Sequence, residues 1–170
     1  MKVLIVSQAE VARFLPMREC IEAMGEALGA LARGDVVLPL RQVVRLPDGK
    51  GLIASMPAHA GHLGAIGLKA ITVFPGNHGT ELDAHQGAVL LFEAERGRLL
   101  AVMDATSITA IRTAAVSGVA TRLLARDDAG DLAILGTGVQ ARTHLEASVR
   151  SSSWSFDGGR ALRGVVGMAG

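Results

Sequence analysis

Residues 132–141 read LAILGTGVQA, an apolar run that ends in a glycine-rich turn. Taken with Asp131, the run DLAIL is typical of a short buried strand, and the following ARTHLEASV has the composition of a helix. We therefore predict a strand at 131–135, a glycine turn and then a helix, the order found in α/β proteins. Such a turn lets a pyrophosphate approach the free N–H groups at the start of the helix.

The match to the dinucleotide-binding pattern GxGxxA is only half complete. A full pattern has an acidic residue about 20 positions further on, which binds the ribose hydroxyls. Asp157 stands at roughly that distance, but the preceding SSSWSF does not resemble a buried second strand. A glycine turn that joins a strand to a helix without binding any ligand is the alternative.

Composition narrows the classes of protein to consider. The 170 residues allow one domain, or one domain and part of another. Lys and Arg total 17 against 16 Asp and Glu, and only 3% of residues are aromatic, so nucleic-acid binding is not expected. The lone Cys20 favours a reducing compartment. No apolar run reaches about 18 residues and no signal peptide is recognisable, so we expect a cytoplasmic protein without a membrane partner.

The chain before this turn divides into recognisable elements. Ser7 and Glu10 form a capping box, and Pro16 and Gly34 bracket an amphipathic helix. We expect a first strand at 3–6, hairpins at 42–56 and 88–103, a strand at 65–74, a long loop at 75–86 and an Ala-rich helix at 106–125. A polar link at 126–130 precedes the DLAIL strand.

Three cations occur on apolar backgrounds. Lys69 interrupts a strand-like run, Arg112 lies in the Ala-rich helix, and Arg41 follows Leu-Pro-Leu. Each could simply point into water, as an edge-strand lysine or a solvated arginine would. Together they indicate a site for an anionic small molecule such as an amino-acid carboxylate. His59 and His62 are three residues apart in a loop context without a third ligand, so no metal site is expected.

These motifs resemble the ornithine cyclodeaminase/mu-crystallin family, and the resemblance covers roughly residues 1–147. The matching pieces occur in the same order along the chain. They are Pro39-Leu40-Arg41, Met56-Pro57-Ala58, Gly67-Leu68-Lys69, Val73-Phe74-Pro75-Gly76-Asn77, His85-Gln86-Gly87, Thr109-Ala110-Ile111-Arg112-Thr113-Ala114-Ala115 and Gly136-Thr137-Gly138-Val139-Gln140-Ala141.

The resemblance implies an α/β protein whose N-terminal part is a mixed α+β domain for substrate binding and dimerisation, at 1–126. The first strand, turn and helix of a Rossmann domain would follow at 127–150, with an aberrant tail at 151–170. Family members are usually homodimers that use NAD or NADP. They exchange a hydride with the carbon next to a carboxylate in an amino or imino acid, as lyases or oxidoreductases.

Carried over position by position, the resemblance also assigns site residues. Arg41, Lys69 and Arg112 would bind the substrate carboxylate, with Lys69 and Arg112 at the reacting centre. Arg112 and Thr113 would face the cofactor. Its pyrophosphate would be cradled by Gly136, Gly138, Val139 and Gln140.

Three departures from the family pattern leave two functions open. Ala84 replaces a frequent cofactor-contacting Thr, and Ala54 replaces a Glu of the cyclodeaminase proper. The catalytic Asp of the cyclodeaminase lies beyond residue 170. We expect the residues from Ser148 to be out-of-frame translation or a truncated gene, with a divergent loop and strand as the alternative. The chain would then be a broken copy of an enzyme that binds NAD poorly, or a non-catalytic mu-crystallin-like binder.

Overall fold

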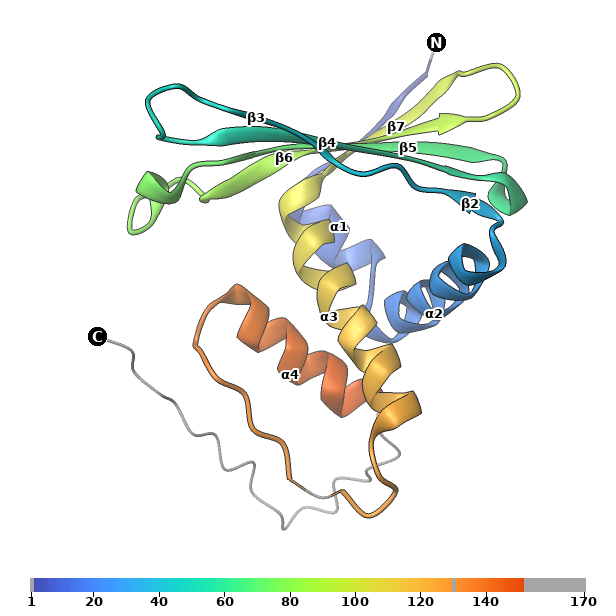
Figure 1. Ribbon diagram of the computed structural model, residues 1–170, viewed down its shortest axis with the longest axis vertical. Coiled ribbons are helices and arrows are strands. Elements are labelled where there is room, and N and C mark those ends of the chain that lie inside the picture. The colour runs from blue at the N-terminus through green and yellow to red at the C-terminus, as the bar shows by residue number, and fades with distance from the viewer. Residues whose placement is uncertain (1, 130, 152–170) are drawn as a thin grey trace. The chain divides into compact units, whose positions relative to one another are not determined.

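The computed structural model of the protein describes residues 2–129 and 131–151 (Figure 1). Two compact units make up the chain. Unit 1 comprises Met1–Phe14 and Leu28–Ile108, and unit 2 comprises Leu15–Ala27 and Thr109–Gly170. These units cut across the predicted domain boundary at residue 126, which stays a prediction. Asp157 and the predicted tail beyond Ser151 lie outside the described residues.

The elements follow one another in the order that the sequence suggests, with strands concentrated between residues 36 and 104. They are β1 (Leu4–Val6), α1 (Gln8–Phe14), α2 (Met17–Arg33), β2 (Val36–Val37), β3 (Gln42–Arg45), β4 (Leu52–Ala60), η1 (Gly61–Leu63), β5 (Ala65–Val73), η2 (Pro75–Asn77), β6 (His85–Glu93), β7 (Leu99–Asp104), α3 (Ala105–Leu124) and α4 (Val139–Ser151). None of the helices among the described residues is long and apolar enough to span a membrane.

Unit 1 is built on one seven-stranded sheet. Its order is β1-β7-β6-β5-β4-β2, and β3 also pairs with β4. The pairing of β1 with β7 is parallel, whereas the other pairings are antiparallel. Strands β4, β5 and β6 have nine residues each and pair over most of their length, so they form a regular platform in which opposite residues share a face.

Local signals in the sequence start and stop these elements as predicted. The Ser7 hydroxyl donates to a Glu10 carboxylate oxygen at 2.6 Å, and the Ser7 backbone N–H donates to the same oxygen at 2.9 Å. This capping box begins α1. Gly34 takes a φ of 82° after the last residue of α2, a value that glycine tolerates. Both expected hairpins form, and the first is closed by a bond from the Leu46 N–H to the Gly51 oxygen at 3.0 Å.

One face of the sheet, which we call the inner face, is covered where α3 begins. Ala105, the first residue of α3, is fully buried against Ala54 of β4 and Ile71 of β5. Gly87 of β6 stands opposite Ile71. A Cβ at Gly87 would overlap the Ala70 carbonyl oxygen and lie 2.7 Å from the Ile71 Cα, so only glycine allows β5 and β6 to pair here.

Unit 2 is a small helical core formed by the first half of α2, most of α3, and α4. Because the buried face of α3 is built from small side chains, the three helices approach closely. A Cβ at Gly118 would lie 3.0 Å from the Ile21 side chain and 3.4 Å from the Ala147 oxygen. The buried residues of this core are Met17, Cys20, Ile21, Ala114, Ala115, Val119 and Ala147.

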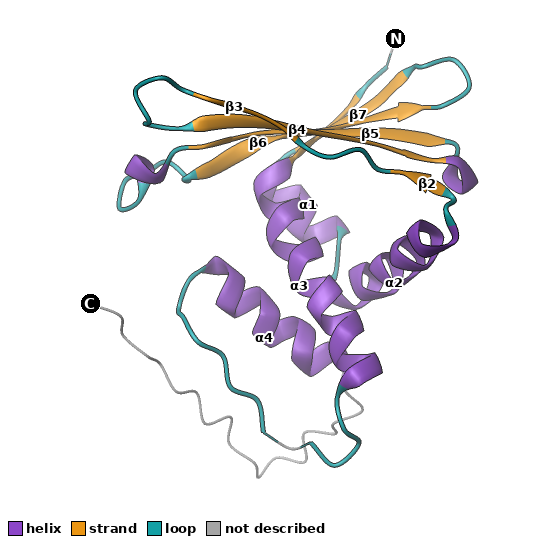
Figure 2. Cartoon of the chain, in the orientation of Figure 1, coloured by secondary structure: helices purple, strands orange, loops and turns teal. Residues whose placement is uncertain are grey.

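The predicted strand at 131–135 is wrong for this structure. Residues 131–138 belong to no helix or strand, and Figure 2 draws the connection into α4 as loop. Leu135 is 86% exposed. A parallel strand needs hydrogen-bonded neighbours on the same sheet, and no other strand of the described part of unit 2 offers them. The helix expected after the glycine turn is confirmed as α4.

Candidate functional site

The sheet register places Lys69 in the middle of the inner face. It lies opposite Met56 on β4 and Val89 on β6, and alternation puts it on the same side as Ile71. Lys69 is half-buried and has an interaction partner in the structure. The lysine that the sequence singled out is therefore an interior residue of a central strand, not an edge lysine.

Arg41 continues the same row of the sheet. Gln42 of β3 pairs with Ser55 of β4, so the preceding residue, Arg41, falls opposite Met56 when this register is extended by one position. Two strand spacings, about 10 Å, then separate the backbones of Arg41 and Lys69. Arg41 is exposed, and no carboxylate of the described residues forms an ion pair with it. With the register extended in this way, Arg41 and Lys69 stand on either side of Met56.

Arg112 and Thr113 lie on α3 in unit 2. Both are half-buried, and helical spacing puts them on one side together with Thr109. Arg112 has no carboxylate partner among residues 2–129 and 131–151. Its charge acts on Cys20. Burial raises the pKa of the Cys20 thiol, and the nearby Arg112 guanidinium partly opposes that rise. A half-buried guanidinium without a carboxylate partner is suited to binding the carboxylate of a ligand.

The glycine turn precedes α4 in an open arrangement. Gly136 has a φ of 109°, which other residues rarely adopt, and a Cβ added at Gly136 or at Gly138 would meet no atom within 4 Å. Val139 and Gln140, the first residues of α4, are exposed. Their N–H groups precede the first intrahelical bond, which the Arg142 N–H donates to the Gly138 oxygen at 3.3 Å. The turn can thus admit an anion such as a pyrophosphate.

The structure groups the predicted site residues within their units. In unit 1 Lys69 lies opposite Met56 on the inner face, and Arg41 directly precedes β3, the strand that pairs with β4. In unit 2 a single turn of α3 carries Arg112 and Thr113. The two positions that depart from the family pattern both belong to unit 1. Ala54 is buried against Ala105, and the Ala84 oxygen accepts the Phe74 N–H at 2.8 Å.

Sequence reasoning missed the role of the proline in Met-Pro-Ala. Pro57 lies in β4 between the residues that pair with β3 and those that pair with β2. The Gly51 oxygen accepts a hydrogen bond from the Leu46 N–H, so the backbone groups of Gly51 point toward β3. Backbone groups of every second residue along a strand point to the same side, so those of position 57 do too. Position 57 therefore faces a gap in the sheet, where the missing N–H of proline costs no ladder bond.

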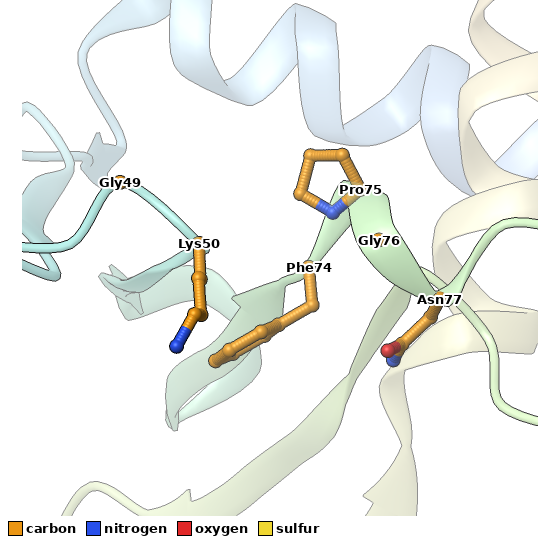
Figure 3. Close-up of a pocket in the computed structure, with 6 residues that line it drawn as sticks. All are labelled: Gly49, Lys50, Phe74, Pro75, Gly76 and Asn77. Atoms are coloured by element: carbon orange, nitrogen blue, oxygen red, sulfur yellow. The ribbon is translucent and has the colours of Figure 1, made fainter.

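Two shallow depressions occur elsewhere on unit 1. Figure 3 shows the first, which has a volume of about 420 Å³ and is lined by Gly49, Lys50, Phe74, Pro75, Gly76 and Asn77. Neither depression is lined by Arg41, Lys69 or Arg112. The two histidines His59 and His62 belong to no cluster of three metal-binding side chains among the described residues.

Comparison with known proteins identifies the family that shares this sequence. The family model described as "Ornithine cyclodeaminase/mu-crystallin family" matches residues 1–155. The chain belongs to the ornithine cyclodeaminase/mu-crystallin family. The match covers the sheet, the helices and the glycine turn, so the family resemblance expected from the motifs is confirmed.

Relatives in the ornithine cyclodeaminase/mu-crystallin family include both curated proteins and solved structures. Ketimine reductase mu-crystallin of Mus musculus is 45% identical over 113 residues, which is 66% of this chain and 36% of the relative. The Thermococcus litoralis Δ1-pyrroline-2-carboxylate reductase, solved with NADH and L-proline, is 35% identical with a TM-score of 0.84, covering 88% of this chain and 46% of that one. An archaeal alanine dehydrogenase dimer with bound NAD is 36% identical with a TM-score of 0.83, covering 89% and 46%.

The shared part is one portion of a longer fold. The chain spans less than half the length of these relatives. The high TM-scores confirm the mixed α/β architecture predicted from the sequence.

Proposed function

We propose that this chain carries the substrate-binding half of an NAD(P)-dependent enzyme that acts on a small amino or imino acid. The observation that carries the proposal is Lys69 opposite Met56 on the inner face, with Arg41 on the other side of Met56 when the β3 register is extended by one residue. Two cations beside the apolar side chain of Met56 favour a substrate with a carboxylate next to a short side chain. Arg112 is the third candidate, because its guanidinium has no carboxylate partner among the described residues.

Within the family, a reductase or dehydrogenase fits better than a cyclodeaminase. The cyclodeaminase pattern has a Glu where this chain has Ala54, and that position is only 4% exposed beneath Ala105. A carboxylate there would be buried beside a fully buried alanine, at a cost of several kcal/mol unless it were paired. The site therefore offers no acidic group at this position for a substrate with a second amine. Cyclodeamination of ornithine to proline with release of ammonia remains the other family reaction.

NAD or NADP is the cofactor that the glycine turn suits. Gly136 and Gly138 leave open space, and the first residues of α4, Val139 and Gln140, present free N–H groups to a pyrophosphate. When bound, the nicotinamide would supply or accept the hydride at the substrate carbon. Lys69 of unit 1 and Arg112 of unit 2 are each a candidate for binding the substrate carboxylate, and Thr113 would contact the cofactor from the same turn of α3 as Arg112. We expect affinity to be low, because residues 131–135 do not form the strand that supports such a turn.

A non-catalytic, mu-crystallin-like binding protein is the second candidate. The observation that favours it is the same loop at 131–135, which leaves the nucleotide site without its sheet. Such a protein would keep the carboxylate row and bind its ligand without turnover.

We further infer a homodimer, as in the alanine dehydrogenase relative. The face of the sheet opposite the inner face is nearly free of charge over its central strands, and an uncharged face is complementary to itself across a two-fold axis. Its side chains include Ile53, Leu68, Leu90, Phe92 and Val102. A cytoplasmic location fits the lone, buried thiol of Cys20.

The experiment combines a binding and a turnover measurement on the 170-residue chain. NADH or NADPH is titrated to millimolar concentration while its fluorescence is followed. The absorbance of the reduced nicotinamide is then monitored with L-alanine or L-proline and the oxidised cofactor. With L-ornithine the release of ammonia is measured instead, because cyclodeamination returns the hydride and leaves the nicotinamide absorbance unchanged. Lys69→Ala is the test variant, and Arg96→Gln, at an exposed hairpin position, is the matched control.

Each outcome separates the candidates. Turnover that falls about a hundredfold or more in Lys69→Ala and is unchanged in Arg96→Gln supports the enzyme. Saturable cofactor binding without turnover supports the binding protein. Absence of both at millimolar cofactor contradicts both proposals, and tight micromolar binding contradicts the expected low affinity.

A further inference from the structure

Two adjoining depressions lie where the β3–β4 hairpin meets the segment after β5. The first holds about 420 Å³ and is drawn in Figure 3, where the side chains of Lys50 and Phe74 run to the same side. The second holds about 220 Å³ and shares Gly49 and Pro75 with the first. Its remaining lining residues are Arg45, Leu46, Pro47, Gly51, Leu52 and Val73.

The second depression has an apolar floor with one cation at its edge. Arg45 of β3 pairs with Leu52 of β4, which pairs with Val73 of β5, so these three side chains form one row on the inner face. Leu46 and Pro47 add further apolar surface. This row lies four residues along β3 from the Arg41 row, about 13 Å away at the rise of a strand.

The charges around the depressions leave one positive charge without a carboxylate partner. Lys50 Nζ pairs with Asp48 at 3.1 Å, so that pair is neutral overall. Arg45 is exposed and forms no ion pair with any carboxylate of the described residues. A single unneutralised guanidinium beside apolar surface is suited to an anion of one charge that also has an apolar body.

Local hydrogen bonds hold both walls in place before any ligand binds. In the hairpin the Gly49 N–H donates to the Leu46 oxygen at 3.0 Å, and the Lys50 N–H donates to Asp48 Oδ1 at 3.1 Å. On the other side the Asn77 side chain donates to the Asp83 oxygen at 3.1 Å. A depression whose lining is already ordered by local hydrogen bonds avoids part of the ordering cost of binding.

We propose that the second depression is a binding site, separate from Arg41 and Lys69, for a small monocarboxylate with an apolar body. The carboxylate pairs with the Arg45 guanidinium, and the apolar body covers Leu52 and Val73. The site is independent of the nucleotide turn and of the proposed hydride chemistry.

The test is a titration of the ¹⁵N-labelled full chain with benzoate, followed by amide chemical shifts. Gly49, Gly51 and Gly76 line the two depressions, and glycine amides resonate in an uncrowded region. Benzamide, a neutral molecule of the same shape, tests the charge. Arg45→Gln removes the guanidinium of this site, and Arg41→Gln removes that of the other row.

We expect saturable benzoate-dependent shifts at Gly49 and Gly51, with a dissociation constant that rises about tenfold in Arg45→Gln. Arg41→Gln should leave this constant unchanged, and benzamide should give no saturation at these glycines. Absence of saturable shifts, an unchanged constant in Arg45→Gln, or equal binding of benzamide would each overturn the proposal. A loss of binding in Arg41→Gln alone would overturn it too, by assigning benzoate to the substrate row.

Discussion

Substitution of Gly87 by alanine should destabilise the sheet severely, because the new methyl group has no space. Its Cβ would overlap the Ala70 carbonyl oxygen and lie 2.7 Å from the Ile71 Cα, both on the neighbouring strand β5. These atoms belong to the backbone, so β5 and β6 would have to separate locally. The backbone φ of 156° at Gly87 adds strain for any other residue.

The expected loss can be worked from these contacts. Separating the strands at the Ile71–Gly87 pair weakens one or two ladder bonds at about 1 kcal/mol each. Crowding in a packed region adds about 1–3 kcal/mol. We therefore expect Gly87→Ala to lower the free energy of unfolding by about 3 kcal/mol, which corresponds to about 10 °C in Tm for a chain of this size.

The matched control is Gly67→Ala on β5. A Cβ at Gly67 meets no atom within 4 Å, so this variant should change the free energy of unfolding by less than about 1 kcal/mol. Urea and thermal unfolding followed by circular dichroism measure both variants. If Gly87→Ala unfolds within about 1 kcal/mol of the wild type, or if Gly67→Ala loses as much, the steric argument is refuted.

Three further predictions concern charges and the thiol. The hydroxyl and backbone N–H of Ser7 lower the pKa of Glu10, so the capping bond stabilises α1 above about pH 4.5 and is lost as pH falls through the lower folded value. The urea midpoint of Glu10→Gln should therefore equal that of the wild type in acid and be lower than that of the wild type at neutral pH. The Arg122–Glu22 pair at 2.6 Å is partly exposed, so a double-mutant cycle should give a coupling of less than about 1 kcal/mol that decreases with salt. Because burial raises the pKa of Cys20, a thiol reagent in mildly alkaline buffer should modify it only in unfolded protein, and fast modification of native protein would contradict this.

Signals that act over a few residues were sufficient to predict most elements of unit 1. The Ser7–Glu10 box and the Pro-Asp-Gly-Lys turn each contain bonding partners that are close along the chain. The Ala-rich character of α3 likewise predicted a thin helix, and the structure uses that thinness in the contact of Gly118 with Ile21. Local chemistry is visible in a single sequence because it does not depend on how distant segments are aligned.

Features that depend on distant partners were predicted poorly. The run at 131–135 has the composition of a parallel strand, but composition cannot supply the neighbouring strands that such a segment requires. Lys69 was selected as a cation on an apolar background, whereas its place opposite Met56 and Val89 arises from the register of three strands. Gly87 was noticed only as part of a motif, since its closeness to Ile71 is a property of the paired strands.

Pro57 has a consequence for the hydrogen bonding of this part of the sheet. Residues around it form a stretch of β4 between the segments of the described sheet that pair with β3 and β2. Residues 38–41 join β2 to β3 alongside this stretch without belonging to a strand, so a backbone donor of β4 that points toward them would have no ladder partner. Proline at position 57 removes that donor. An alanine at position 57 would restore an N–H that the sheet does not satisfy, so the Met-Pro-Ala motif lets the chain pass from β2 to β3 without an unpaired donor at this position.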